Sequence, residues 1–160
     1  MTAENNQEPN ERERILVSVA WPYVNGPFHA GHVSGVYIPA DIFARYQRAR
    51  GRDVIMVSGS DCHGTPITIR AEQEGVTPVD IVNRYHPMIL ATLDKLGIEF
   101  DLFTTTLTEN HYAVTQDMFL KLLEKGYLYK EVMTGSYSEA QGRFLPDRYV
   151  EGTCPFCKNP

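Results

Sequence analysis

Two histidines, His29 and His32, stand three positions apart in a turn of small residues, a pattern that suits the binding of an anion. The turn joins an apolar segment at residues 15–20, expected to be a buried strand, to a helix expected to begin at about His32. The start of a helix offers unpaired backbone N–H groups and the positive end of the helix dipole. Gly31 lets a ligand approach the backbone closely, and both imidazoles can donate ring N–H groups to phosphate oxygens. These residues therefore predict a nucleotide-phosphate site.

A second polar motif, Gly-Ser-Asp-Cys-His-Gly-Thr-Pro at residues 59–66, follows an apolar run at residues 53–58 that is typical of a strand buried on both faces. Carboxyl ends of parallel strands meet at one rim of a sheet, so this motif and the histidines are expected to share that rim. Asp61 places a carboxylate there, where it either caps the helix that starts near Thr65 or binds a ligand. Its position at the rim favours the ligand. His63 is expected to support Asp61 or the backbone.

The chain has three cysteines, which fits a reducing compartment and a metal site better than a disulfide framework. Cys154 and Cys157 have the spacing of a zinc knuckle. Such a pair supplies two of the four ligands that zinc needs, so by itself it could equally be a redox pair. Cys62 is expected to be a small packed residue, because nothing beside it suggests a nucleophile.

The order of elements predicts an α/β fold, with a Rossmann-like parallel sheet and flanking helices. Three strands are expected, at residues 15–20, 53–58 and 100–105, and four helices, beginning near residues 32, 65, 78 and 108. The first helix is expected to bury a stripe made of Val36, Ala40, Phe43 and Ala44. Pro39 and Pro87 lie within the expected helices and predict a kink or a broken turn in each.

The organisation along the chain predicts three parts. Residues 1–14 are polar and acidic and are interpreted as a disordered tail. Residues 15–126 are expected to form the α/β domain, and residues 127–160, rich in turns and aromatic residues, to begin a second domain that contains the cysteine pair.

The composition and charge of the chain indicate its cellular location more clearly than its function. The chain has 160 residues and a net charge of −5, which argues against a general nucleic-acid-binding surface, although not against contact with the end of a nucleic-acid strand. No apolar run approaches the roughly 18 residues that a membrane span needs, and no basic and apolar leader opens the sequence. We therefore expect a cytoplasmic protein without a membrane partner.

Several motifs, taken together and in order, carry a family resemblance. The pattern His-x-Gly-His at residues 29–32 is the signature of class I aminoacyl-tRNA synthetases, and some nucleotidyltransferases share it. Around it stand Ala-Trp-Pro-Tyr-Val-Asn-Gly at residues 20–26, the motif at residues 59–66, Phe-Leu-Pro-Asp-Arg at residues 144–148 and Gly-Thr-Cys-Pro-Phe-Cys at residues 152–157. From about residue 15 to the last residue, the chain resembles the methionyl-tRNA synthetase family.

The resemblance implies a function and a set of roles. In that family methionine is activated by ATP with Mg²⁺ and transferred to tRNA(Met), so the partners implied are methionine, ATP and that tRNA. It implies that His29 and His32 are catalytic and, with Gly31, contact the ATP phosphates. It implies a methionine site formed by Ala20, Tyr23 and Asp61, in which the carboxylate holds the α-ammonium group. It also implies a structural Zn²⁺ held in part by Cys154 and Cys157. Trp21 stands where bacterial relatives often have leucine, which leaves its part in the pocket open.

Parts of the family pattern are missing from the 160 residues. The lysine-rich KMSKS loop, a second Cys-x-x-Cys and the anticodon-binding helices are absent, so we expect the first half of a class I synthetase catalytic domain and the start of a zinc-knuckle insertion. Such a piece is expected to be inactive alone, to hold zinc weakly or not at all, and to have poor solubility or marginal stability, because the apolar sheet edge intended for further strands would be exposed. Two other functions stay open: a non-catalytic adenine-nucleotide-binding module, and a nucleotidyltransferase with the same histidine signature.

Overall fold

The computed structural model describes residues 12–149, 152–153 and 156–157. They form two compact units, one that ends at Thr108 and one that begins at Glu109. Most of the predicted tail lies outside the described residues. Arg14, which the sequence places in that tail, is already the first residue of a strand.

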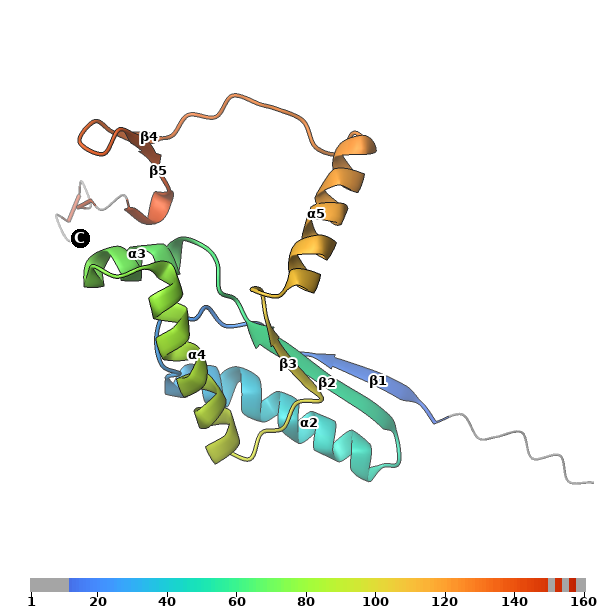
Figure 1. The fold of residues 1–160 in the computed structure, drawn as a ribbon. Coiled ribbons are helices and arrows are strands. Elements are labelled where there is room, and N and C mark those ends of the chain that lie inside the picture. Colours follow the sequence, from blue (N-terminus) through green and yellow to red (C-terminus); the bar gives the residue numbers. More distant parts are fainter. Residues whose placement is uncertain (1–11, 150–151, 154–155, 158–160) are drawn as a thin grey trace, which may run out of the picture. The chain divides into compact units, whose positions relative to one another are not determined.

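The first unit contains a parallel sheet with the strand order β1-β2-β3 (Figure 1). Strand β1 (Arg14–Ser18) and strand β3 (Leu102–Thr105) lie on either side of β2 (Asp53–Ser60), which extends two residues beyond its predicted end. The register pairs Leu16 with Ile55 and Val57 with Leu102. Because helices connect the parallel strands, the predicted α/β class is confirmed.

The helical segment after β1 has an internal change of geometry. It begins as α1 (Ala30–His32), widens into the π-helical turn η1 (Val33–Tyr37) and continues as α2 (Ile38–Ala49). Pro39 stands in the first turn of α2, where its missing N–H group costs little. The helical segment thus changes its geometry just before Pro39, and the kink expected at Pro39 itself stays a prediction.

The inward face of this segment differs from the predicted one. The buried residues are Tyr37 at the end of η1 and Asp41, Ala44 and Gln47 of α2, and the predicted inward residue Phe43 is 45% exposed. The prediction of Phe43 was wrong because successive residues of an α-helix point about 100° apart, so Phe43 turns away when its neighbour Ala44 faces the core.

Two further helices follow β2. Helix α3 (Thr65–Glu74) begins after Gly64 and ends at Gly75, whose φ of 67° is left-handed. Helix α4 (Pro78–Lys95) begins with a capping box, in which the Thr77 hydroxyl accepts from the N–H of Asp80 and the Asp80 carboxylate accepts from the N–H of Thr77. This start agrees with the sequence. Helix α4 continues through Pro87 without a break.

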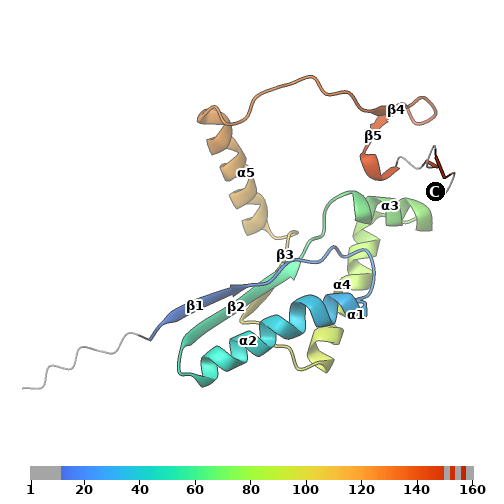
Figure 2. The same ribbon diagram turned by 180° about the vertical axis from the view of Figure 1, so that it is seen from behind.

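The hydrophobic core lies on one face of the sheet. Val54 and Met56 of β2 point into it, where they join apolar residues from η1, α2 and α4, namely Tyr37, Ala44, Ile81, Val82, Tyr85, Ile89 and Leu93. Figures 1 and 2 show the first unit from opposite sides.

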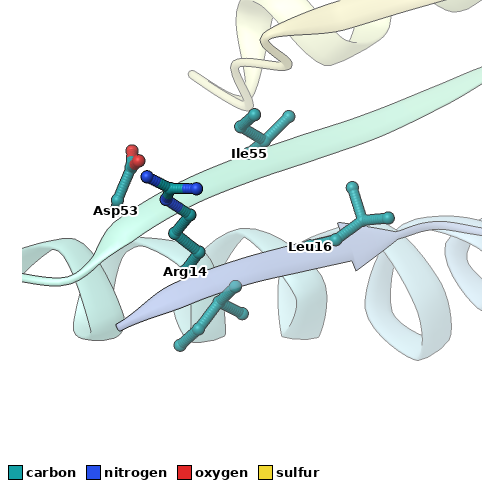
Figure 3. A pocket seen from close by; sticks show the side chains of 5 residues that line it. Arg14, Leu16, Asp53 and Ile55 are labelled. Atoms are coloured by element: carbon teal, nitrogen blue, oxygen red, sulfur yellow. The ribbon is translucent and has the colours of Figure 1, made fainter. Parts of the chain in front are cut away.

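The opposite face of the sheet is open in the described residues. Leu16 is 68% exposed, Ile55 51% and Leu102 57%. Leu16 and Ile55 line a shallow hollow together with Arg14, Ile15 and Asp53 (Figure 3). The prediction that the strand at residues 53–58 is buried on both faces was therefore wrong, because no element of the described residues covers the face that carries Ile55.

The second unit contains helix α5 (Glu109–Glu124) and an antiparallel pair of short strands, β4 (Ser136–Ser138) and β5 (Arg143–Leu145), followed by the 3-10 turn η2 (Asp147–Tyr149). The predicted helix and hairpin are thus present. Helix α5 belongs to the second unit, which begins at Glu109, whereas the predicted boundary between the domains lies after residue 126. Those domain limits stay a prediction.

The centre of the sheet depends on a residue without a side chain. A Cβ atom on Gly59 would lie 2.7 Å from the carbonyl oxygen of Thr104 and 2.7 Å from ring atoms of Trp21. We expect Gly59→Ala to lower the free energy of unfolding of the chain by about 1–3 kcal/mol, measured by urea denaturation followed by circular dichroism. Gly35→Ala is the matched control, because its Cβ would meet nothing within 4 Å. Equal stability of the two variants would contradict the close packing of Trp21 on β2.

Candidate functional site

The two predicted motifs meet at the carboxyl ends of β1 and β2. A parallel bridge joins Tyr23 to Asp61. The N–H of Asp61 donates to the carbonyl oxygen of Pro22 at 2.8 Å, and the carbonyl oxygen of Asp61 accepts from the N–H of Val24 at 3.1 Å. The structure therefore brings together the turn after β1 and the loop after β2, as the parallel arrangement predicts.

The histidine turn forms its own helix cap. His29 is the N-cap of α1, which begins at Ala30, two residues earlier than predicted. The Nδ1 atom of His29 accepts from the N–H of Gly31 at 3.1 Å, and Nδ1 of His32 accepts from the N–H of His29 at 3.4 Å. The two rings stack with their centroids 3.8 Å apart. Sequence reasoning placed the helix start two residues too late, because histidine is not among the usual N-cap residues that mark a helix start.

Gly31 has a structural reason to be glycine. A Cβ atom there would lie 3.0 Å from Cε1 and 3.1 Å from Nδ1 of His29. The absence of a side chain lets the His29 ring fold back over the first turn of the helix.

The tautomers of the two imidazoles follow from the cap. Each Nδ1 accepts a backbone N–H, so a neutral ring carries its proton on Nε2. Burial, and then the charge of His29, lowers the pKa of His32 from 6.5, so His32 is neutral at pH 7. The turn can thus offer ring N–H donors to an anion without burying a positive charge on His32.

An aromatic stack supports this turn. The Phe28 ring lies 5.3 Å from His32 and 4.8 Å from Tyr37, and the Tyr37 hydroxyl donates to the carbonyl oxygen of Ala20 at 3.2 Å. Burial raises the pKa of Tyr37 to about 12, which keeps that donor protonated. Sequence reasoning missed Tyr37, although its position seven residues before Ala44, on the inward stripe of α2, is a signal that could have found it.

Asp61 is not the cap of the following helix. Gly64 is the N-cap of α3 and makes no side-chain capping bond, while Oδ1 of Asp61 accepts from the N–H of His63 at 3.2 Å. The capping alternative is therefore wrong, because the loop turns at Gly64, with a φ of 102°, before the helix begins. The half-buried Asp61 carboxylate stays at the rim that Tyr23 shares.

The other predicted binding residues lie on the same segment. Ala20 and Tyr23 are exposed, and the Tyr23 ring lies against Gly64, since a Cβ atom there would be 3.5 Å from the ring. Trp21, the residue whose role is open, packs on Gly59 of β2. An exposed phenol and methyl group beside a carboxylate suit a small ligand with an apolar part and a cationic group.

Two neighbours of Asp61 have supporting positions. The ring Nε2 of His63 lies 3.3 Å from the carbonyl oxygen of Thr106. Cys62 is buried, and burial raises the pKa of its thiol, which agrees with the predicted packed residue and not with a nucleophile.

The predicted metal ligands are only partly described. Cys157 is an exposed free thiol, and Cys154 lies outside the described residues. Within residues 12–149, 152–153 and 156–157, no group of three or more His, Cys, Asp or Glu side chains is placed to hold a metal ion. In the same ranges, no helix is long and apolar enough to cross a membrane.

The fold and the site define a Rossmann-like α/β protein with a turn suited to phosphate beside a carboxylate suited to an ammonium group. Residues 15–160 match the family model described as tRNA synthetases class I (M), and the chain belongs to this family. The predicted resemblance is confirmed.

The curated relatives bear the same name. The chain is 70% identical over 148 residues to "Methionine--tRNA ligase" of Roseiflexus sp. (strain RS-1), a match that covers 92% of this chain and 25% of that protein. It is 63% identical over 148 residues to "Methionine--tRNA ligase" of Thermomicrobium roseum, again over 92% of this chain and 25% of the relative. The chain thus spans about a quarter of the length of these relatives.

A solved structure supports the fold. Mycobacterium tuberculosis methionyl-tRNA synthetase, in complex with methionyl-adenylate, matches with a TM-score of 0.74 and 27% identity. The match covers 92% of this chain and 30% of that chain. The predicted Rossmann-like fold of a class I synthetase catalytic domain is confirmed.

The lowered pKa values of two histidines predict a pH-dependent stability. Burial lowers the pKa of His86, as it does that of His32, below the 6.5 of an unperturbed imidazole. The unfolded chain then binds protons at a pH where the folded chain does not, so the free energy of unfolding falls as the pH drops from about 7.5 to about 5.5. Urea denaturation at several pH values measures this. The variant His32→Asn/His86→Asn is expected to flatten the profile, and a wild-type profile that is flat or rises towards low pH would contradict the burial of these rings.

Proposed function

We propose that this chain is part of a methionine–tRNA ligase, which activates methionine with ATP to methionyl adenylate and transfers the methionyl group to tRNA(Met). The observation that carries this proposal is the 70% identity, over nearly the whole chain, to a relative named "Methionine--tRNA ligase". The geometry supports it, because a phosphate-type turn and a carboxylate lie on one rim of the sheet.

In the proposed activation step, a carboxylate oxygen of methionine attacks the α-phosphorus of ATP. The bond from that phosphorus to the bridging oxygen breaks, and pyrophosphate leaves with the electron pair. In the second step, a ribose hydroxyl at the tRNA end attacks the acyl carbon and AMP leaves. Neither step needs a covalent enzyme intermediate, so the work of the protein is alignment of the reactants and stabilisation of developing charge.

His29, Gly31 and His32 are proposed to contact the ATP phosphates. Both Nδ1 atoms are occupied by backbone N–H groups, so the two Nε2–H groups are the atoms that would meet phosphate oxygens. Such fixed donors stabilise negative charge as it builds on the phosphoryl oxygens. Magnesium would arrive with the nucleotide as part of the substrate.

Ala20, Tyr23 and Asp61 are proposed to bind methionine. The Asp61 carboxylate would hold the α-ammonium group, and Ala20 and Tyr23 would contact the thioether side chain. The backbone bridge between Tyr23 and Asp61 supports this assignment, because it fixes the carboxylate relative to the phenol. Recognition of both ends of the amino acid would then depend on one rigid unit.

The proposal also includes a structural zinc site and a cellular location. Cys154 and Cys157 are proposed to contribute two thiolates to a structural zinc site that needs two further ligands. No step of the reaction is assigned to that metal. A reaction on tRNA and the three cysteines fit a cytoplasmic location.

A chimera tests the activity and the two main roles. In it, this chain replaces the quarter of the Roseiflexus sp. relative that it matches. We expect ATP–pyrophosphate exchange with methionine alone among the twenty amino acids. Asp61→Asn is expected to raise KM for methionine roughly 10- to 100-fold through loss of a charge-assisted bond, and His29→Ala to lower kcat roughly 100-fold.

The control for charge removal is Asp94→Asn, a surface position on α4. Exchange with another amino acid would overturn the methionine assignment. No exchange at all would favour the adenine-nucleotide-binding module.

The zinc assignment has its own test. We expect the purified chimera to lose bound zinc when Cys157 or Cys154 is changed to Ser, as measured by elemental analysis. Cys62→Ser is the matched control, because this thiol is buried in the core of the first unit and is expected to leave the zinc content unchanged. A zinc content that survives Cys154→Ser and Cys157→Ser would remove these residues from the site.

A further inference from the structure

The residues on either side of Asp61 are anchored in the interior of the first unit. Along extended backbone, neighbouring side chains alternate between faces. Ser60 is fully buried and Cys62 is buried, whereas Asp61 is half-buried and His63 is exposed. The orientation of the Asp61 carboxylate therefore depends on how its two inward neighbours are held.

Ser60 is held by a histidine from another element. Its hydroxyl lies 2.8 Å from Nδ1 of His86, in the third turn of helix α4. His86 is far from Asp61 in the sequence, and its ring also lies 6.4 Å from the Phe103 ring of β3. Burial lowers the pKa of His86, so its imidazole is neutral at neutral pH, and Nδ1 shares one hydrogen bond with the Ser60 hydroxyl.

Cys62 is held from the end of β3. Its N–H donates to Oγ1 of the buried Thr106 at 2.9 Å, and the N–H of Thr106 donates to the carbonyl oxygen of Ser60 at 3.1 Å. With Ser60 and Cys62 both fixed, the backbone between them has little freedom, and Asp61 meets Pro22 and Val24 in one arrangement.

We propose that His86, through its hydrogen bond to Ser60, is a positioning residue that sets the orientation of Asp61 and thereby the affinity for the amino-acid substrate. This inference rests on the proposed function, in which Asp61 binds the α-ammonium group. It assigns to α4, a helix without a residue in the predicted site, a part in substrate recognition. Small displacements of a binding group are enough for such an effect.

The test compares two changes at His86 in the chimera, with ATP–pyrophosphate exchange as the readout. His86→Leu removes the hydrogen bond to Ser60, and the leucine side chain still occupies most of the space of the imidazole. His86→Asn keeps a polar atom near the position of Nδ1. We expect His86→Leu to raise KM for methionine roughly 10-fold or more, with KM for ATP changed less than about 2-fold, and His86→Asn to recover most of the loss.

Two further variants keep the outcome interpretable. Ser60→Ala removes the same bond from the other side with a smaller change of volume, so it replaces His86→Leu if that variant does not fold. The double variant Ser60→Ala/His86→Leu is expected to be no worse than the worse single variant, because both remove one interaction. Asn83→Ala, at an exposed position of α4, is the control and is expected to be neutral.

The outcomes separate this inference from the proposed function. Absence of methionine-dependent exchange in the unchanged chimera contradicts the proposed function. Normal exchange there, with unchanged KM for methionine in His86→Leu and Ser60→Ala, overturns the positioning role alone. Equal rises of KM for methionine and for ATP also overturn it, because general loosening of the fold acts on both substrates.

Discussion

The contact on which the site depends is the backbone bridge between Tyr23 and Asp61. It continues the pairing of β1 and β2 beyond the ends of both strands, so two loops that would otherwise move independently become one piece of sheet. Along the chain, the histidine turn follows the Tyr23 side of this bridge, and helix α3 follows the Asp61 side. Because backbone hydrogen bonds form the bridge, the placement of the site is insensitive to the identity of most side chains around it.

Side chains then adjust what the backbone has placed. The Tyr37 hydroxyl holds the carbonyl of Ala20, His29 covers the first N–H groups of the helix, and His86 and Thr106 hold the backbone around Asp61. Each of these bonds involves a polar atom that is either wholly or partly buried or part of a helix cap. Buried polar groups need partners, so the same bonds serve stability and geometry together.

Much of this arrangement was predictable from local signals. The parallel sheet, the capping box at Thr77 and the meeting of the two motifs follow from apolar runs, cap residues and the strand–helix order. The inward face of α2 was mispredicted at Phe43, because that face carries the polar residues Asp41 and Gln47, which a pattern of apolar residues does not reveal. The Ser60–His86 contact joins residues 26 positions apart and depends on how α4 packs, which no local pattern encodes. The open sheet face was missed for a similar reason, because burial of Ile55 needs a covering layer that the described residues lack.

The self-capped histidine turn also selects the kind of ion that it can accept. Both Nδ1 lone pairs are engaged by backbone N–H groups, so in the neutral state each ring presents hydrogen and not a lone pair on its other nitrogen. A metal ion needs a lone pair from imidazole, so the turn offers it no ligand in this arrangement. Paired histidines commonly bind metal ions, but here the hydrogen bonds to the start of their own helix leave both rings as hydrogen-bond donors. A divalent cation that accompanies a bound anion would then be held by the oxygens of the anion and not by these imidazoles.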